Sequence, residues 1–436
     1  MVTGSNYLLE TQGKKILIDC GLHQGGKLAE RENFEKFPYD PKEIETIFIT
    51  HAHLDHTGLL PKLVRDGFRG VIYSTPPTRD FAEQLLIDSE RILVKEAERE
   101  QMPPLYTMEH IELLMTLWRP VQYHTLAKAG DVEAMFFDAG HILGSSILEL
   151  KAEGKRIVFS GDLGNVSTPL IRETESITNA DYCVMESTYG DQIHENIDTR
   201  RDLLERAIVE TINAGGTLMI PAFAMERTQE LLLEINELMR GKKIPKVPVY
   251  IDSPLAIKLT AVYEKYASYF NTKEFPAVHM PFFDFPGLHL TLTPEQSKEI
   301  NDVLPPKIII AGAGMSNGGR IVHHERRYLS DPKSTILFIG FQAEGSLGRK
   351  IFDGAKTVQI FGEEILIRCR VLAIGGYSAH ADQVKLLEWV GAMRAKVKKV
   401  FLVHGEEYAS EALAVKIRDQ FKLEVIVPDL AKTYEL

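Results

Sequence analysis

The feature that constrains the fold of this chain most is a short run of potential metal ligands, HAHLDH, at residues 51–56. It follows an apolar, strand-like segment at 46–50 and leads into residues 57–64, which have the spacing of a helix. Because alternate residues of an extended segment project to the same side, we expect the first two histidines to face one point and Asp55 and His56 a second. Imidazole and carboxylate groups are ligands that zinc, manganese and iron accept. A site for two metal ions is therefore favoured over the alternatives, polar loop residues or histidines that are satisfied by nearby carbonyls.

The length and composition indicate an ordinary globular protein. A chain of 436 residues suggests two domains, or one domain with a large insertion. We find neither a signal peptide nor an apolar run near the ~18 residues that span a membrane. Cys20, Cys183 and Cys369 lie far apart in apolar surroundings and form no CxxC pair. They are typical of buried thiols in a reducing compartment, and we expect a cytoplasmic location.

The net charge of −11 argues, taken alone, against a nucleic-acid partner. A site for two divalent cations needs clustered carboxylates, however, and the bound cations would cancel part of that charge. Local basic stripes also matter more than the total. The charge balance therefore does not exclude a nucleic acid.

Two later strand-like segments, at 136–141 and 157–162, also end in a potential ligand. Read alone, His141 would more often be structural and Asp162 more often a turn residue. Together with the first run they predict His51, His53 and His141 on one metal, Asp55 and His56 on the other, and Asp162 as the bridge. The second metal remains one ligand short. Asp19 also ends a strand; capping its turn is the default, although the position suits orienting a metal ligand.

Residues 5–10 and 15–21 alternate like a hairpin around a Gln-Gly turn, and apolar residues recur at helical spacing over 78–101 and 107–117. From about residue 196 the pattern changes to strand-then-helix units. Strands are expected at 217–221, 249–252 and 307–311, each before a helix, at 226–239, 256–267 and 319–329. Such alternation is typical of a parallel α/β sheet.

The ligand pattern resembles that of the metallo-β-lactamase superfamily. Further segments resemble the β-CASP nucleases: MESTYG at 185–190 is similar to their motif A, GYSAHAD at 376–382 to motif B, and LVHGE at 402–406 to motif C. Other agreeing stretches are VTGS at 2–5, PAFA at 221–224, GMS at 314–316 and QAEGSLGR at 342–349. The resemblance covers essentially the full length.

The resemblance implies an α/β fold: an αββα metallo-β-lactamase sandwich with an inserted parallel-sheet α/β β-CASP domain. We expect residues 1–195 to form the first part of the metallo-β-lactamase domain. Residues 196–368 would form the inserted β-CASP domain. Residues 369–436 would complete the first domain.

The resemblance also implies a ribonuclease that hydrolyses phosphodiester bonds of single-stranded RNA during RNA processing or decay, similar to ribonuclease J and to the nuclease subunit of the cleavage and polyadenylation specificity factor. Two Zn²⁺ ions, or Mn²⁺ in their place, would hold the attacking hydroxide. His404 in motif C is the implied missing ligand of the second metal. The implied catalytic residues are His380, which would assist the leaving group, Glu186, which would orient His380, and Asp55. Without the motif, a buried His380 bonded to Asp382 would be an equal alternative.

Contacts with RNA are expected in the inserted domain. The glycine-rich segment 312–319 precedes a helix, so its N–H groups could hold a phosphate. Arg320, His323, His324 and Arg327 share a face of that helix; a solvated basic face is the default, but a phosphate track is favoured here. The candidate RNA contacts are Ser316, Gly318 and Arg320, and the resemblance implies Arg227, Ser346 and Arg349 as further candidates.

Two other functions stay open. One is a small-molecule hydrolase such as a thioesterase or lactonase, which ester turnover without RNA cleavage would support. The other is a non-catalytic RNA-binding subunit, which loss of the metal would support. The sequence does not distinguish an endonuclease from a 5′-3′ exonuclease, or a monomer from a homodimer.

Overall fold

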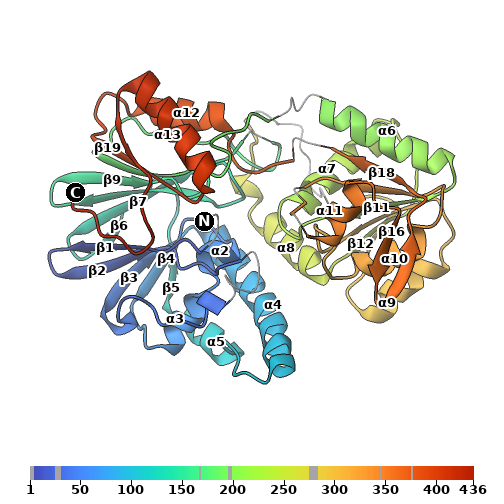
Figure 1. Ribbon diagram of the computed structural model, residues 1–436, viewed down its shortest axis with the longest axis horizontal. Coiled ribbons are helices and arrows are strands. Elements are labelled where there is room, and N and C mark those ends of the chain that lie inside the picture. Colours follow the sequence, from blue (N-terminus) through green and yellow to red (C-terminus); the bar gives the residue numbers. More distant parts are fainter. Residues whose placement is uncertain are drawn as a thin grey trace. The chain divides into compact units, whose positions relative to one another are not determined.

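The computed structural model describes residues 4–24, 31–165, 168–194, 199–273, 283–340, 342–343, 345–374 and 377–436. The chain divides into two compact units (Figure 1). The first unit comprises Met1–Ile193, Ser268–Asn271 and Ala379–Leu436, and the second comprises His194–Ala267 and Thr272–Ser378. None of the described helices is long and apolar enough to cross a membrane.

The first unit contains two sheets among its described residues. The five-stranded sheet has the order β1-β2-β3-β4-β5, with β1 at Tyr7–Thr11, β2 at Lys14–Ile18, β3 at Ile44–Phe48, β4 at Val71–Ser74 and β5 at Trp118–Pro120. The seven-stranded sheet has the order β20-β19-β10-β9-β8-β7-β6. Its strands are β6 at Ala127–Ala129, β7 at Val132–Asp138, β8 at Ser146–Ala152, β9 at Lys155–Phe159, β10 at Tyr182–Glu186, β19 at Lys399–Val403 and β20 at Glu424–Ile426.

The apolar side chains of the two sheets form one core between them. Ile16, Ile18 and Phe48 of the first sheet belong to the same buried cluster as Phe136 and Leu148 of the second. The burial pattern of strand β7 is consistent with this packing. Its residues alternate between buried and partly buried, with the period of two that is expected of a strand with one buried face. Pairing of β1 with β2 is antiparallel, as the hairpin pattern predicts.

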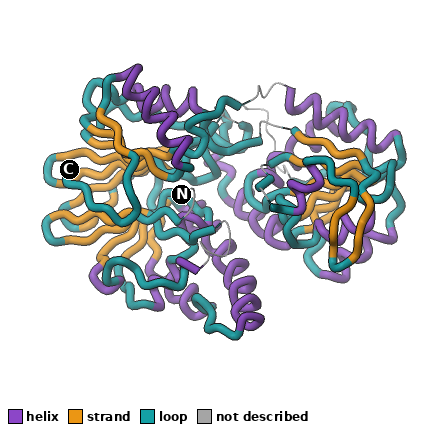
Figure 2. Tube along the Cα trace, viewed as in Figure 1, coloured by secondary structure: helices purple, strands orange, loops and turns teal. Residues whose placement is uncertain are grey.

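Helices cover the outer faces of both sheets. A second core joins Met185 and Leu402 of the seven-stranded sheet to Leu386, Trp389 and Leu413 of two helices, α12 at Gln383–Ala392 and α13 at Glu407–Phe421. On the side of the five-stranded sheet lie α2 at Leu54–Thr57, α3 at Leu60–Arg65, α4 at Pro76–Glu100 and α5 at Met108–Leu117 (Figures 1 and 2). A 3-10 turn, η1 at Pro41–Glu43, precedes β3. The predicted αββα sandwich is confirmed.

The single helix predicted over 57–64 is wrong in detail, because the structure has two short helices there. The first, α2, begins earlier and ends at Thr57, with Gly58 as its C-cap. The second, α3, carries Pro61 in its first turn, where the missing N–H of proline costs nothing. The break leaves His56 on α2, directly after the other potential ligands of residues 51–55.

The second unit is built on a parallel sheet of six strands among the described residues, in the order β13-β12-β14-β11-β15-β18. Its strands are β11 at Thr217–Pro221, β12 at Val249–Asp252, β13 at Leu288–Leu290, β14 at Lys307–Ala311, β15 at Thr335–Phe338 and β18 at Arg370–Ala373. Strands β11, β12, β14 and β15 are buried throughout, as expected of a parallel sheet covered on both faces. A separate hairpin joins β16 at Thr357–Ile360 to β17 at Glu363–Leu366.

The helices of the second unit alternate with these strands, as the sequence predicts. They are α6 at Arg200–Asn213, α7 at Arg227–Arg240, α8 at Pro254–Lys265, α9 at Pro294–Glu299, α10 at Ile321–Tyr328 and α11 at Leu347–Phe352, with a 3-10 turn, η4, at Ile300–Asp302. Another 3-10 turn, η3 at Ala267–Tyr269, runs into the segment Ser268–Asn271 of the first unit. The inserted parallel-sheet domain is thereby confirmed. The domain boundaries at 195/196 and 368/369 stay a prediction. In the structure β18 pairs with β15, so the segment that follows residue 368 continues the second unit.

Asp252, at the end of β12, is a buried carboxylate that organises one edge of the second unit. Its oxygens accept hydrogen bonds from Thr291 Oγ1 at 2.6 Å, Ser297 Oγ at 2.6 Å and Arg320 Nη1 at 2.7 Å, and His324 Nε2 lies 2.7 Å away. Burial raises the pKa of Asp252, but the hydrogen bonds from His324 and its other partners outweigh burial and lower the pKa below its usual value. The side chain is therefore ionised and fully partnered.

Replacing Asp252 by alanine is expected to destabilise the second unit by about 3–5 kcal/mol, because Arg320 loses its counter-charge and His324 loses its hydrogen-bond partner. Urea unfolding measures the loss. The control, Ser297→Ala, removes one donor of the same carboxylate and should cost only about 1 kcal/mol. Equal losses in the two variants would contradict the role of Asp252.

Candidate metal centre

Strand direction brings four polar side chains to one edge of the seven-stranded sheet. Strands β9, β10 and β19 are parallel neighbours, so their carboxyl ends lie together. Asp162 follows β9, Glu186 ends β10 and His404 directly follows β19. Two antiparallel pairings separate β7 from β9, so β7 runs in the same direction and His141, three residues beyond its end, reaches the same edge.

The first sheet contributes the run at 51–56, which follows β3. Its backbone is fixed by hydrogen bonds from Ser5 N to Asp55 O at 2.9 Å and from Cys20 N to His56 O at 2.8 Å. Gly21 permits this close approach, because a Cβ at that position would lie 1.6 Å from the carbonyl oxygen of Asp55. The turn therefore holds its side chains in place through the backbone.

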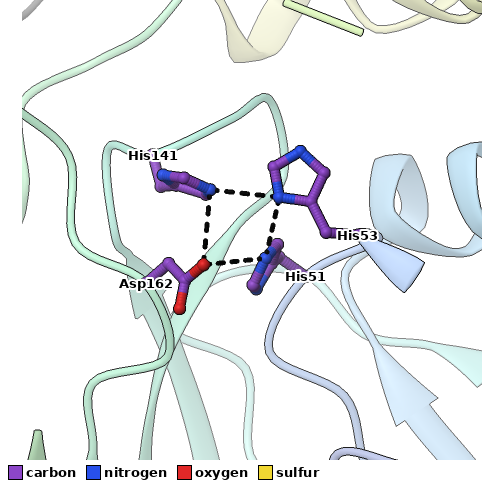
Figure 3. A group of neighbouring side chains, drawn as sticks. All are labelled: His51, His53, His141 and Asp162. Carbon is purple, nitrogen blue, oxygen red and sulfur yellow. Dashed lines mark hydrogen bonds and ion pairs between the residues drawn. The ribbon is translucent and has the colours of Figure 1, made fainter. Parts of the chain in front are cut away.

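The first ligand group consists of His51, His53, His141 and Asp162, whose side chains point toward one another (Figure 3). His53 Nδ1 lies 3.1 Å from His51 Nε2 and 3.2 Å from His141 Nε2. Asp162 Oδ2 lies 3.3 Å from His51 Nε2 and 3.6 Å from His141 Nε2. Two atoms that bind one tetrahedral zinc ion at about 2.0–2.1 Å are themselves roughly 3.3 Å apart. The spacing of the four atoms therefore fits a cation.

The second ligand group consists of Asp55, His56 and His404. His404 Nε2 lies 3.6 Å from Asp55 Oδ2. The other oxygen of Asp162, Oδ1, faces this group and lies 3.3 Å from His56 Nε2 and 3.8 Å from His404 Nε2. One carboxylate thus presents one oxygen to each group, which is the arrangement of a ligand shared by two cations.

Unpaired polar atoms support the fit to metal ions. A neutral imidazole has a single N–H donor, so three ring nitrogens directed at one point cannot all satisfy one another. Within the described residues, no well-aligned hydrogen bond reaches the buried atoms His56 Nε2 and Asp162 Oδ1, although the two lie 3.3 Å apart. Buried polar atoms are rarely left in that state. The residues present therefore fit a pair of bound cations.

The pKa shifts within the first ligand group agree with metal binding. Burial, together with the neighbouring His51, lowers the pKa of His53 to about 3, and burial holds the pKa of His141 well below its usual value. Both rings are neutral at pH 7, the form that binds metals. Burial raises the pKa of Asp162, but the facing histidines, His404 first among them, outweigh burial and hold that pKa well below its usual value.

Asp19 lies directly behind the second group. Its Oδ2 is 2.7 Å from His56 Nδ1, and its two oxygens accept hydrogen bonds from the backbone N and the hydroxyl of Thr50, each at 2.8 Å. This contact fixes the ring of His56 with Nε2 toward Asp162. The sequence leaves this role open beside the capping of the turn, and the role of Asp19 in orienting a ligand stays a prediction.

His380 and Glu186 form a third polar group with Asp162. His380 Nδ1 lies 3.2 Å from Glu186 Oε2 and 3.8 Å from Asp162 Oδ2. Glu186 is itself held by the backbone N–H of Leu163, which donates to Oε1 at 2.6 Å. Burial lowers the pKa of His380, but the carboxylates of Glu186 and Asp162 outweigh burial and raise the pKa to about 9. Asp382, the alternative partner considered for His380, accepts a hydrogen bond from Lys385 N as the cap of α12.

Two residues close to the centre carry no role in the sequence prediction. Ser5 Oγ lies 2.9 Å from His404 Nδ1, and Thr50 Oγ1 lies 3.1 Å from His51 Nδ1. Ser5 belongs to the matched stretch 2–5, but the pattern alone does not reveal its contact with a residue 399 positions away. Val2, Thr3, Glu344 and Gly376, which belong to matched stretches, lie outside the described residues.

The candidate RNA contacts lie in the second unit, where several of them bind their own chain. Arg320 donates to Asp252 and to Thr291 O at 2.9 Å, while His324 is buried against the same carboxylate. The basic face expected on α10 is therefore partly turned inward, because the ionised Asp252 attracts it. Other internal contacts are Ser316 to Glu325, Arg227 to Glu230, Arg349 to Asp353, and Ser346 as the cap of α11. Gly318 has open space around it.

Comparisons with known proteins agree with this geometry. Family models match for the metallo-beta-lactamase superfamily at residues 2–174, the Beta-Casp domain at 228–351 and the Zn-dependent metallo-hydrolase RNA specificity domain at 364–428. Ribonuclease TTHA0252 of Thermus thermophilus is 37% identical over 93% of this chain and 91% of its own length. An RNase J-like protein of Methanocaldococcus jannaschii is 34% identical over 96% and 94% of the two chains.

Two further matches extend the comparison. The transcription termination factor FttA of Methanosarcina mazei is 32% identical over 96% of this chain and 68% of its own length. A crystal structure of a protein of unknown function from Enterococcus faecalis V583 is 13% identical, with a TM-score of 0.55 over 98% and 96% of the chains, and shares the fold. The chain therefore belongs to the β-CASP ribonuclease family of the metallo-β-lactamase superfamily, a family of hydrolases.

Replacing Asp19 by alanine should lower zinc affinity by about 10- to 100-fold, because the ring of His56 loses the carboxylate that orients it. Competition with a chromophoric chelator measures the affinity. The control is Asp181→Ala, which removes a carboxylate that accepts from Arg156 N at 2.9 Å and pairs with Lys398 in the same unit. If Asp19→Ala and Asp181→Ala bind zinc equally well, Asp19 does not orient a ligand.

Proposed function

We propose that this chain is a two-metal ribonuclease that hydrolyses phosphodiester bonds of single-stranded RNA. The observation that carries the proposal is Asp162, which presents one oxygen to each of two groups of ligand atoms. The match to an RNA specificity domain and the names of the relatives support RNA as the substrate. Zn²⁺ is the favoured metal, with Mn²⁺ as the alternative.

The proposed ligands follow the two groups. His51, His53 and His141 would hold one cation, Asp55, His56 and His404 the other, and Asp162 both. When bound, two such cations lower the pKa of water and neutralise the charge that builds up on a phosphodiester during in-line displacement. The chain's own contribution is rigid placement, since backbone hydrogen bonds fix the turn that bears Asp55.

His380 would act on the leaving group. Hydrolysis forms a new phosphorus–oxygen bond and breaks the bond from phosphorus to the 3′ oxygen, which needs a proton to depart as a hydroxyl. The carboxylate of Glu186 beside the ring favours the protonated form of His380 and raises its pKa against the effect of burial, so His380 could donate that proton. Glu186, 3.2 Å from the ring, would hold the imidazole in place. The products would be a 3′-hydroxyl and a 5′-phosphate.

Replacing His380 by alanine should lower RNA cleavage by about 10²- to 10⁴-fold, because the leaving 3′ oxygen loses its proton donor. The variant should keep its metal content, as measured by elemental analysis. The matched control is His124→Ala, which removes an exposed histidine of the same unit that pairs with Glu175.

The assay uses RNA labelled separately at the 5′ and the 3′ end. Mononucleotides released from the 5′ end indicate exonuclease action, and internal fragments indicate endonuclease action. Full activity in the His380 variant would remove this residue from the mechanism. Hydrolysis of thioesters or lactones by a wild-type protein that leaves RNA intact would favour a small-molecule hydrolase instead.

A further inference from the structure

The stretch at 221–224, which the sequence resemblance singles out, takes no part in the metal centre. It lies in the second unit at the carboxyl end of β11 and includes Phe223. The side chain of Phe223 is 42% exposed, although Ala222 and Met225 beside it are buried. A single exposed phenylalanine is common on protein surfaces. What distinguishes this ring is how firmly the chain around it is held.

Buried polar side chains of α7 hold the backbone that carries Phe223. The hydroxyl of Thr228 donates to the carbonyl oxygen of Phe223 at 2.8 Å, and Nε2 of Gln229 donates to that of Ala224 at 3.1 Å. Both Thr228 and Gln229 are buried. The segment that follows β11 is therefore fixed to the helix that comes after it.

The same segment ends in a strained turn at Glu226. This residue has φ 68° and ψ −61°, and Arg227 N donates to Met225 O at 2.8 Å. A γ-turn with positive φ is rare and strained for a residue other than glycine. The hydroxyl of Tyr263 donates to the buried carboxylate of Glu226 at 2.5 Å and helps to hold it there. Strain of this kind clusters at sites that bind ligands.

One face of the Phe223 ring lies against backbone. A Cβ placed on Gly314 would be 2.8 Å from Cδ2, 2.9 Å from Cε2 and 3.1 Å from Cγ of the ring. Nearly equal distances to three consecutive ring atoms place Gly314 over the face of the ring rather than at its edge. Glycine at this position therefore lets the ring lie flat against the chain. Because 42% of the side chain is exposed, the opposite face is open to solvent.

A buried amide joins the two glycine segments beside the ring. A Cβ on Gly340 would lie 3.3 Å from Cε2 of Phe223. Nε2 of Gln342 donates to the carbonyl oxygens of Gly314 and Gly340, each at 3.0 Å. The support beneath the ring is thus formed in advance, and a ligand would bind it with little loss of conformational entropy.

The order of the strands places Phe223 where parallel sheets bind ligands. Strands β11 and β15 are neighbours, but the chain passes from β11 through α7 to β12 toward one edge of the sheet, and from β15 to β18 toward the other. Phe223 follows β11, and Gly340 follows β15. In open α/β sheets, ligands bind outside the carboxyl ends of strands whose connections diverge in this way.

We infer that Phe223 is a stacking platform for one base of a single-stranded RNA bound to the second unit. The inference rests on the proposed function, because it takes RNA as the ligand. A flat, exposed aromatic ring accepts any nucleobase, since every base has a π-face, so this contact adds affinity without reading sequence. The ring carries no charge, so it should leave the salt dependence of binding unchanged.

Binding of a single-stranded phosphorothioate oligoribonucleotide, which resists hydrolysis, to the zinc-loaded full chain tests the inference. Phe223→Ala should weaken binding by about 5- to 150-fold, which corresponds to the loss of one stacked base. Phe223→Leu keeps an apolar side chain against Gly314 but has no aromatic face, and it should lose most of the same affinity. Both variants should keep the wild-type Tm.

The matched control is Phe361→Ala. Phe361 lies at the turn of the separate β16–β17 hairpin and is 60% exposed, more than Phe223. If exposed apolar area alone supported binding, this control would lose at least as much affinity as Phe223→Ala. It should instead bind RNA as the wild type does.

An oligomer of the same backbone and length whose riboses carry no bases separates stacking from other roles. Wild-type protein and Phe223→Ala should bind this abasic oligomer equally. An equal deficit of Phe223→Ala on both oligomers would overturn the inference, because the ring would then act on the RNA backbone or only on its own loop. Unchanged affinity of Phe223→Ala for the oligomer that carries bases would overturn it as well.

The variant Phe223→Trp gives a direct readout of stacking. A base stacked on its indole ring should quench the fluorescence, whereas the two natural tryptophans, Trp118 and Trp389, are buried and should respond little. We expect RNA to quench Phe223→Trp but not the wild type, with affinity at least equal to that of the wild type. RNA that binds without quenching would contradict the stacking platform.

Cleavage of ordinary RNA by the zinc-loaded wild type, measured in parallel, separates this inference from the proposed function. Weaker binding by Phe223→Ala without any cleavage by the wild type would refute the ribonuclease and leave the stacking platform in place. Cleavage by the wild type with equal binding by both proteins would refute the platform alone. A wild-type protein that binds no RNA would refute both.

Discussion

The first unit depends on the compensation of one buried charge, the carboxylate of Asp162. It is 1% exposed, and five histidines lie 3.3–3.8 Å from its oxygens: His51, His56, His141, His380 and His404. A buried ion is stable only when charge and hydrogen bonds compensate its lost hydration. The segments after β3, β7 and β19 supply four of these rings, and the segment after β18 supplies His380. The arrangement of the strands in the sandwich therefore also brings together the side chains that determine the chemistry of its edge.

Both units use the carboxyl ends of parallel strands, but they use them differently. In the second unit, Asp252 has four donors that satisfy it completely, and the result is an internal tie for Arg320 and His324. In the first unit, ring nitrogens converge on Asp162, and its Oδ1 has no hydrogen-bond partner among the described residues. A carboxylate whose oxygens are fully hydrogen-bonded stabilises the fold. A carboxylate that faces imidazole rings and lacks such hydrogen bonds fits bound cations.

Local spacing explains how much of the site could be predicted from the sequence. The run at 51–56 and the strand-end positions of His141 and Asp162 are local signals, and the structure brings these residues together. The position of His404 depended on resemblance, because its contacts are with residues hundreds of positions away. The contact of Ser5 with His404 has no local signature. Likewise, the inward turn of His324 depends on Asp252, which is 72 residues distant.

The central claim is that Asp162 is shared by two cations, and anomalous diffraction from crystals of the zinc-loaded protein tests it directly. We predict two anomalous peaks per chain, one among His51, His53 and His141 and one among Asp55, His56 and His404. Each should lie about 2.0–2.2 Å from an oxygen of Asp162. A single peak, or two peaks of which one does not touch Asp162, would contradict the shared carboxylate.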